Sequence, residues 1–298
     1  MRQALISGLL HLTAMLPLRL VHWIGAGLGG LLGWIPNEPR HIAERNLALC
    51  FPEWTPVERN RLLRRNLVET GKGLLELGPL WLWGGERVLA LVQGAVAGED
   101  ALADAARQQR GAILITPHLG AWEMAGLYYS SRYPLTILYR PSRVGLDEIS
   151  RQGRGRVGGK VVATDTRGIR ALLKGLRQGE VLGILPDQDA GGDSVDDHEG
   201  HLFAPFFGIA ASTMTLVSRL ALKTGAPVFL TWAERLPRGR GYALHLRRLP
   251  TVTTAASLAE SVAALNQGVE AAVRTLPAQY LWSYRRFKTR PPGQAKLY

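Results

Sequence analysis

Residues 111–131 read GAILITPHLGAWEMAGLYYSS and join three structural signals in one short stretch. The apolar run at 111–116 is rich in β-branched side chains, which is typical of a buried strand. A short loop with a histidine follows, and residues 120–132 have the pattern of a helix. A buried strand that leads directly into a helix is half of a β–α–β unit, so this stretch predicts a parallel sheet covered by helices.

The same alternation continues towards the carboxyl end of the chain. Further strands are expected at 135–141, 160–164, 180–188, 226–236 and 242–249. Further helices are expected at 145–158, 168–179, 211–225 and 258–276. The pattern predicts one α/β domain over residues 37–298, with a mostly parallel central sheet that is flanked by helices and ends in an antiparallel hairpin.

The first 36 residues differ in composition from the rest of the chain. Between Ala4 and Pro36 the only charged residue is Arg19. A helix that spans a bilayer needs about 20 apolar residues, and Pro17 with Arg19 divides this run into two shorter halves. A buried core helix and a signal peptide are alternatives, although no small-x-small cleavage site follows. We expect a hydrophobic membrane segment at 1–36, either a tilted span or an interfacial hairpin with Arg19 reaching the headgroups.

The charge balance points to an anionic partner. The chain has 36 Lys and Arg against 24 Asp and Glu, a formal net charge of +12. This balance favours nucleic acid, an anionic bilayer or a phosphorylated ligand. The aromatic residues lack the strand-borne pattern of a base-stacking surface, so we expect anionic lipid rather than nucleic acid. The single cysteine, Cys50, excludes an internal disulfide and fits a reduced cytoplasmic setting.

Polar side chains follow four of the expected strands at the point where each strand ends. Ligand sites in open α/β sheets form beyond the carboxyl ends of the strands. The residues in these positions are His118, Arg140, Asp165, Arg167, Asp187 and Asp189. Their shared position predicts that they converge on one crevice.

His118 and Glu123 have the spacing of a base and its carboxylate partner. If the helix begins near Gly120, Glu123 lies in its first turn, where a carboxylate suits the helix dipole. A carboxylate bonded to one ring nitrogen raises the basicity of the imidazole and leaves the other nitrogen to take a proton. The spacing alone also fits a surface or capping histidine. No Gly-x-Ser-x-Gly elbow occurs, so a serine acyl-enzyme is not indicated.

The chain resembles the bacterial lipid A late acyltransferase family, within the glycerolipid acyltransferase superfamily with its His-x4-Asp/Glu motif. The resemblance covers nearly the whole chain and rests on HLGAWE, YRPSRVGLDE, LPDQDAGG, APFFGIAASTMTLVSRLALKTGAPVFLTWAER and QYLWSYRRFK, in that order. It implies a glycerolipid-acyltransferase-like fold at the cytoplasmic side of the bacterial inner membrane. It also implies transfer of a fatty acyl group from acyl carrier protein or acyl-CoA to a hydroxyl of a lipid A precursor. In this interpretation His118 is the general base, Glu123 is its partner, and no covalent acyl-enzyme forms.

Six further residues are candidates for substrate binding. The resemblance implies that Arg140 helps to bind substrate, although a surface salt bridge is an alternative. Arg167, and likewise Arg154 and Arg156, are candidates for binding phosphate groups of the acceptor or of the donor's phosphopantetheine arm. Asp187 and Asp189 are expected either to orient the acceptor or a partner arginine, or only to cap their loop.

The acyl chain needs an apolar groove, and three phenylalanines are candidates for its wall. Phe203, Phe206 and Phe207 are expected there or in the core. The acidic segment at 193–201 lacks the spacing of a zinc site, so no metal and no cofactor beyond the acyl donor is expected. A different glycolipid, a lysophospholipid acceptor, or a non-enzymatic basic membrane protein are the alternatives.

Overall fold

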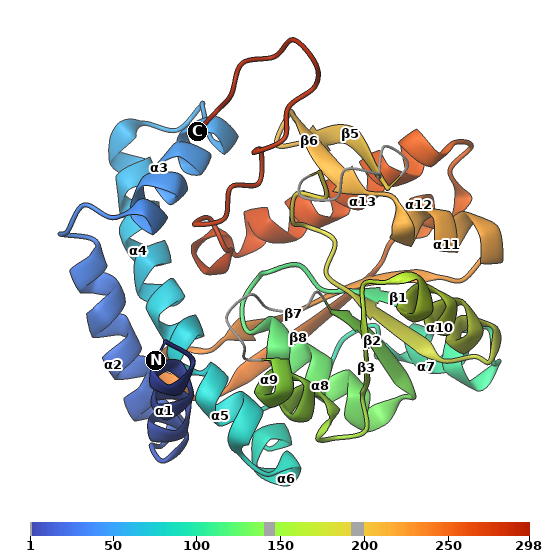
Figure 1. Cartoon of the computed structure of the whole chain (residues 1–298), viewed down its shortest axis with the longest axis horizontal. Coiled ribbons are helices and arrows are strands. Elements are labelled where there is room, and N and C mark those ends of the chain that lie inside the picture. Colours follow the sequence, from blue (N-terminus) through green and yellow to red (C-terminus); the bar gives the residue numbers. More distant parts are fainter. Residues whose placement is uncertain (1, 140–146, 192–199) are drawn as a thin grey trace.

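The computed structural model describes residues 2–139, 147–191 and 200–298, and it contains the expected mostly parallel sheet (Figure 1). Six strands lie in the order β3-β2-β4-β1-β7-β8, of which only β8 runs antiparallel to its neighbour. A separate antiparallel pair is formed by β5 and β6. The strands are β1 (Ala112–Ile115), β2 (Leu135–Tyr139), β3 (Lys160–Ala163), β4 (Val181–Ile184), β5 (His201–Phe206), β6 (Ile209–Met214), β7 (Val228–Arg235) and β8 (Tyr242–Arg248).

Helices cover both faces of the sheet and extend to one side of it (Figure 1). The amino-terminal helices are α1 (Arg2–Ala14), α2 (Leu18–Leu32), α3 (Glu38–Cys50), α4 (Pro56–Leu75), α5 (Leu77–Leu82) and α6 (Gly85–Leu89). Those that follow are α7 (Glu99–Arg107), α8 (Trp122–Arg132), α9 (Asp147–Gly155), α10 (Thr166–Arg177), α11 (Leu216–Thr224), α12 (Pro250–Thr254) and α13 (Leu258–Thr275). Short 3₁₀ turns, η1 (Pro237–Gly239) and η2 (Pro277–Gln279), follow β7 and α13.

The central strand β1 shows why this part of the sequence is continuously apolar. All four of its residues are buried, because parallel strands inside an α/β domain are covered on both faces. Ile113 and Ile115 join a core cluster with Leu172 of α10 and Val217 of α11. Ala112 and Leu114 join a cluster on the other face with residues of α7 and α8, among them Tyr129.

The sequence interpretation missed the β5–β6 hairpin and placed most of β6 in a helix from residue 211. In the structure α11 begins only at Leu216, and β6 pairs in register with β5. The turn between them has positive φ at Phe207 (51°) and Gly208 (74°). Such a two-residue turn matches the twist of an antiparallel pair, so residues 209–214 pair with β5 instead of extending the helix.

The prediction of a membrane-spanning segment within residues 1–36 is wrong. Within the described residues, none of the helices combines the length and apolar character that crossing a membrane requires. The chain bends at Pro17, so that α1 has 13 residues and α2 has 15, each short of the roughly 20 that a span needs. One face of α2 is moreover buried against protein, since Val21 and His22 are almost fully enclosed.

Glycines allow α2 to lie in direct backbone contact with α4. A methyl group added at Gly25 would come within 2.7 Å of the carbonyl oxygen of Gly71, and one added at Gly29 within 2.1 Å of that of Leu67. Side chains other than hydrogen are therefore excluded on this face. The low charge of the segment thus reflects a helix pair that packs on the domain. Large apolar side chains on and beside α2 are exposed, among them Met15, Trp23 and Trp34.

Candidate active site

A cavity of about 760 Å³ opens at the carboxyl ends of β1, β2 and β4. His118, Glu123, Gln188 and Asp189 are among its lining residues, so the predicted convergence of strand ends is found for β1 and β4. The cavity also continues along β2, from Tyr139 back to Leu135. Four residue steps at about 3.3 Å each make this roughly 13 Å of strand.

The register of the sheet places His118 beside Asp187. Ile115 of β1 pairs with Ile184 of the adjacent parallel strand β4, and each of the two polar residues follows its strand by three positions. Asp187 Oδ2 accepts a hydrogen bond from the backbone N–H of His118 (2.9 Å), and its Oδ1 lies 2.8 Å from the ring Nδ1. Both the backbone and the ring of His118 are therefore held by one carboxylate.

The ionisation of Asp187 determines which ring nitrogen of His118 carries the proton. Burial raises the pKa of Asp187, but the charge of His118 and its hydrogen bonds outweigh burial and hold this pKa below its usual value. An ionised Asp187 accepts a hydrogen bond from Nδ1–H, so the proton of the neutral ring lies on Nδ1 and Nε2 keeps its lone pair. The amide nitrogen of Gln188 lies 3.2 Å from Nε2 and can donate to it. His118 thus has the arrangement of a general base whose basic lone pair is on Nε2.

Glu123 is paired with an arginine rather than with the imidazole. Its carboxylate accepts two hydrogen bonds from Arg154 of α9, from Nε (2.9 Å) and Nη2 (2.5 Å). Burial raises the pKa of Glu123, but the charge and hydrogen bonds of Arg154 hold it below its usual value. Both side chains line the cavity. The ring nitrogen that we expected Glu123 to hold is bonded by Asp187 instead.

The remaining predicted substrate-binding residues have different positions. Arg140 lies outside the described residues. Arg167 is exposed at the start of α10 and does not line the cavity. Asp189 lines the cavity, but its carboxylate accepts from the backbone N–H groups of Gly191 (2.9 Å) and Thr289 (2.6 Å), which is a loop-capping arrangement.

The apolar wall of the cavity comes from other residues than the three predicted phenylalanines. Phe206 and Phe207 belong to the core, and Phe203 is only part-buried; none of the three lines the cavity. The wall is formed instead by Leu114, Leu135, Ile137, Leu138, Ile184 and Leu185, with Gly126 of α8 and Gly183 of β4 between them.

Gln188, the pairing of Arg154 with Glu123 and the pairing role of Asp187 were not identified from sequence, which offered Arg154 only as a phosphate-binding candidate. Asp187 and His118 were both placed at strand ends, but their contact depends on β4 lying next to β1, which is a property of the whole sheet. Arg154 stands 31 residues from Glu123 on another helix, and no local pattern links the two. The described residues contain no group of His, Cys, Asp and Glu side chains arranged to hold a metal ion.

Comparison with known proteins identifies the family to which the chain is similar. The family described as bacterial lipid A biosynthesis acyltransferase matches residues 2–289. The lipid A biosynthesis lauroyltransferase of Escherichia coli is 33% identical over 98% of this chain and 92% of its own length. The palmitoleoyltransferase of the same pathway in E. coli is 31% identical over 98% and 92% of the two chains, and the myristoyltransferase 25% identical over 92% and 82%.

Proposed function

Because the chain belongs to the bacterial lipid A biosynthesis acyltransferase family, we propose that it transfers a fatty acyl group from acyl carrier protein to a hydroxyl of a lipid A precursor. The family match and the acyltransferase relatives confirm the resemblance inferred from the sequence. The donor, the acceptor hydroxyl and the roles of individual residues are the proposed part.

The proposed reaction is a direct transfer with His118 as general base. Nε2 removes the proton from the acceptor hydroxyl, and the resulting oxygen attacks the thioester carbonyl to form the new C–O bond. The C–S bond then breaks, and the thiolate leaving group takes the proton from the imidazolium. Asp187 stabilises the imidazolium while the proton resides on it, as a carboxylate partner does in other base-catalysed acyl transfers.

The observation that carries this proposal is the His118–Asp187 pair, with His118 in the wall of a cavity that has an apolar section along β2. It is tested by mass spectrometry of lipid A from cells with and without the gene. Loss of one secondary acyl chain, restored by the wild-type gene, is the expected result. Unchanged lipid A with an acyl group lost from another glycolipid or lysophospholipid would identify a different acceptor and contradict the proposal.

We further propose that the donor's acyl chain lies in the part of the cavity that follows β2. The wall there is apolar, and burial of each methylene group contributes about 0.8 kcal/mol. Gly126 and Gly183 leave room beside Leu135 and Ile137, because neither carries a side chain. The three relatives are named for different acyl groups, lauroyl, palmitoleoyl and myristoyl, so we expect chain length to depend on such local features rather than on the family.

Gly126→Leu is expected to shift the preferred donor to a shorter acyl chain. A methyl group added at Gly126 meets no atom closer than 3.9 Å, from Ile137, so a larger side chain fills cavity space without a backbone clash. One methylene changes discrimination by about 1–3 kcal/mol, which corresponds to roughly 10-fold or more in relative kcat/KM. The measurement is competition between donors of different length, with Gly126→Ala as the small control. An unchanged preference in Gly126→Leu would place the acyl chain elsewhere.

We also propose that the protein works at the cytoplasmic side of the bacterial inner membrane. The acceptor would be a lipid, and exposed apolar side chains lie on α2 and around it, with exposed fractions of 74% for Trp23 and 84% for Trp34. Tryptophan is favoured at the level of lipid headgroups, and the net charge of +12 favours anionic lipid.

The Trp23→Ser, Trp34→Ser double variant is expected to lose most of its binding to vesicles that contain anionic phospholipid. Both side chains are exposed in the folded chain, so their replacement removes apolar contact with lipid and leaves the core intact. Co-flotation with vesicles measures binding, and thermal unfolding checks the fold. Equal flotation of variant and wild type would contradict this placement.

A further inference from the structure

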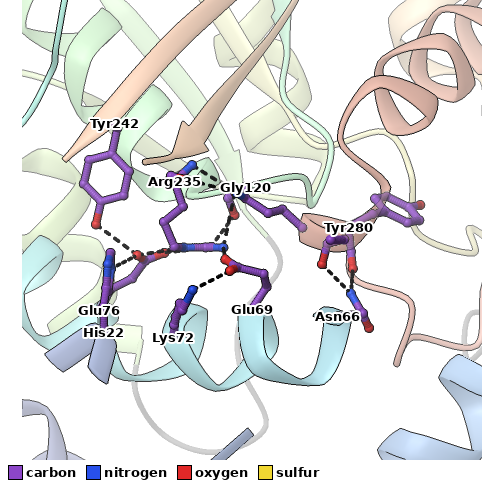
Figure 2. Close-up of polar contacts among 11 residues, drawn as sticks. His22, Asn66, Glu69, Lys72, Glu76, Gly120, Arg235, Tyr242 and Tyr280 are labelled. Carbon is purple, nitrogen blue, oxygen red and sulfur yellow. Dashed lines mark hydrogen bonds and ion pairs between the residues drawn. The ribbon is translucent and has the colours of Figure 1, made fainter. Parts of the chain in front are cut away.

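A buried polar network connects the amino-terminal helices with the loop that carries His118 (Figure 2). Its centre is the pair of Arg235, at the end of β7, and Glu76, between α4 and α5, with exposed fractions of 5% and 2%. The Nε of Arg235 lies 2.9 Å from both carboxylate oxygens of Glu76. His22 of α2 and the hydroxyl of Tyr242 each lie 2.9 Å from Glu76 Oε2.

Both members of the central pair are ionised. Burial raises the pKa of Glu76, but the charge of Arg235 and the hydrogen bond from His22 outweigh it and hold this pKa below its usual value. Burial lowers the pKa of Arg235, and the charge of Glu76 more than compensates, so the guanidinium stays protonated. A buried ion pair of this kind is weak evidence for stability, because apolar replacements of similar volume are often as stable. The remaining contacts of Arg235 indicate a role other than stability.

The outward N–H groups of Arg235 reach the active-site loop. Nη2 donates to the carbonyl oxygen of Gly120 at 2.8 Å, while Nη1 donates to Glu69 at 3.1 Å. Gly120 follows His118 by two residues. The backbone of Arg235 is held as well, because the side chain of Gln279 bonds to both its N–H (2.9 Å) and its carbonyl oxygen (3.0 Å).

The backbone conformation at Gly120 is fixed by hydrogen bonds and by close packing. Gly120 has a φ of +64°, and a methyl group there would come within 2.0 Å of the carbonyl oxygen of Ala233. Its N–H donates to the backbone carbonyl of Gln279 (3.0 Å), so the peptide is gripped from both sides. Within the described part of the chain, Arg235 and Asp187 are the two charged side chains that bond to the backbone of residues 116–121.

We propose that Arg235 is a positioning residue for His118. Glu76 orients the guanidinium, the guanidinium holds the Gly120 carbonyl, and the Gly120 peptide sets the direction in which His118 leaves β1. His22 makes the amino-terminal helix α2 part of this support. The inference rests on the proposed function, in which Nε2 of His118 must lie within hydrogen-bond reach of the acceptor hydroxyl.

Arg235→Lys is the first variant to measure, in the purified full-length chain with an acyl carrier protein thioester and a lipid A precursor. A lysine ammonium keeps the positive charge beside Glu76 but lacks the planar fork that reaches Glu76 and Gly120 together. A misplacement of about 1 Å at the base lowers the rate roughly 10²-fold. We therefore expect kcat to fall about 10²-fold, with the KM of both substrates nearly unchanged.

The Glu76→Gln, Arg235→Met double variant separates positioning from stability. It leaves no buried charge of the pair uncompensated, so its melting temperature is expected near that of the wild type, yet the bond to Gly120 is absent and kcat stays low. Asn266→Ala is a matched control, because it removes buried hydrogen bonds to Ala204 and Thr213 that do not touch the loop.

Three outcomes would overturn the inference: wild-type kcat in a folded Arg235→Lys enzyme, recovery of kcat together with stability in the double variant, or an equal loss of kcat in Asn266→Ala. A wild-type enzyme without activity on the lipid A precursor would contradict the proposed function instead.

Discussion

Replacement of His118 by alanine is expected to lower kcat for acyl transfer by roughly 10²–10⁴-fold, the usual contribution of a positioned general base. Thioesters are already reactive at their carbonyl carbon, so the step that needs the enzyme most is the removal of the hydroxyl proton. The His118 side chain contributes only part of the cavity wall, and the apolar section along β2 does not depend on it. The KM for the acyl donor is therefore expected to change little.

Steady-state kinetics with purified protein and measured melting temperatures are the test for His118→Ala. The His118 side chain lines the cavity and is 13% exposed in the wild type, so its removal enlarges the cavity without opening the core, and the fold is expected to persist. A kcat within a few fold of the wild type in a folded protein would show that another group accepts the proton.

Asp187→Asn is expected to have the second largest effect, a fall in kcat on the order of 10²–10³-fold. Asp187 accepts two hydrogen bonds from His118, one from the backbone and one from the ring. An asparagine has one acceptor oxygen, so if it serves the backbone N–H its amide group faces Nδ1 and the ring proton moves to Nε2. The lone pair needed for proton removal then points away from the acceptor.

Glu123→Gln is the matched comparison for Asp187→Asn. Both variants exchange a buried carboxylate for its amide, but Glu123 is bonded to Arg154 and not to the imidazole. A smaller loss of kcat is therefore expected for Glu123→Gln. The reverse order, with Glu123→Gln the more damaged enzyme, would contradict the role given to Asp187 and support the pairing expected from the sequence.

The strand–helix alternation was predictable because each strand and the helix after it have a recognisable local sequence pattern. The run at 112–115 is buried on both faces and apolar throughout, and the following helix begins after the Gly120 turn. The β5–β6 hairpin was not predictable in the same way, because Phe207 and Gly208 adopt positive φ in a turn that the apolar pattern does not reveal.

The candidate site was predictable as a set of strand ends but not as a set of contacts. Which carboxylate meets His118 depends on the order of strands in the sheet, and β4 lies between β1 and β2. Likewise, composition shows that residues 4–36 are apolar but not whether protein or lipid covers them. Gly25 and Gly71 decide that question on one face of α2, and their contact joins segments 46 residues apart.

The contact between α2 and α4 also limits how the chain can be dissected. Gly71 lies opposite Gly25 with no side chain between the two backbones, so a cut near residue 36 would bare a strip of peptide groups on α4 that no neighbouring side chain shields. The same cut would remove His22 from Glu76. The first two helices are therefore an integral part of the folded domain. A chain shortened at this point would expose backbone and a buried polar group that α2 covers in the intact protein.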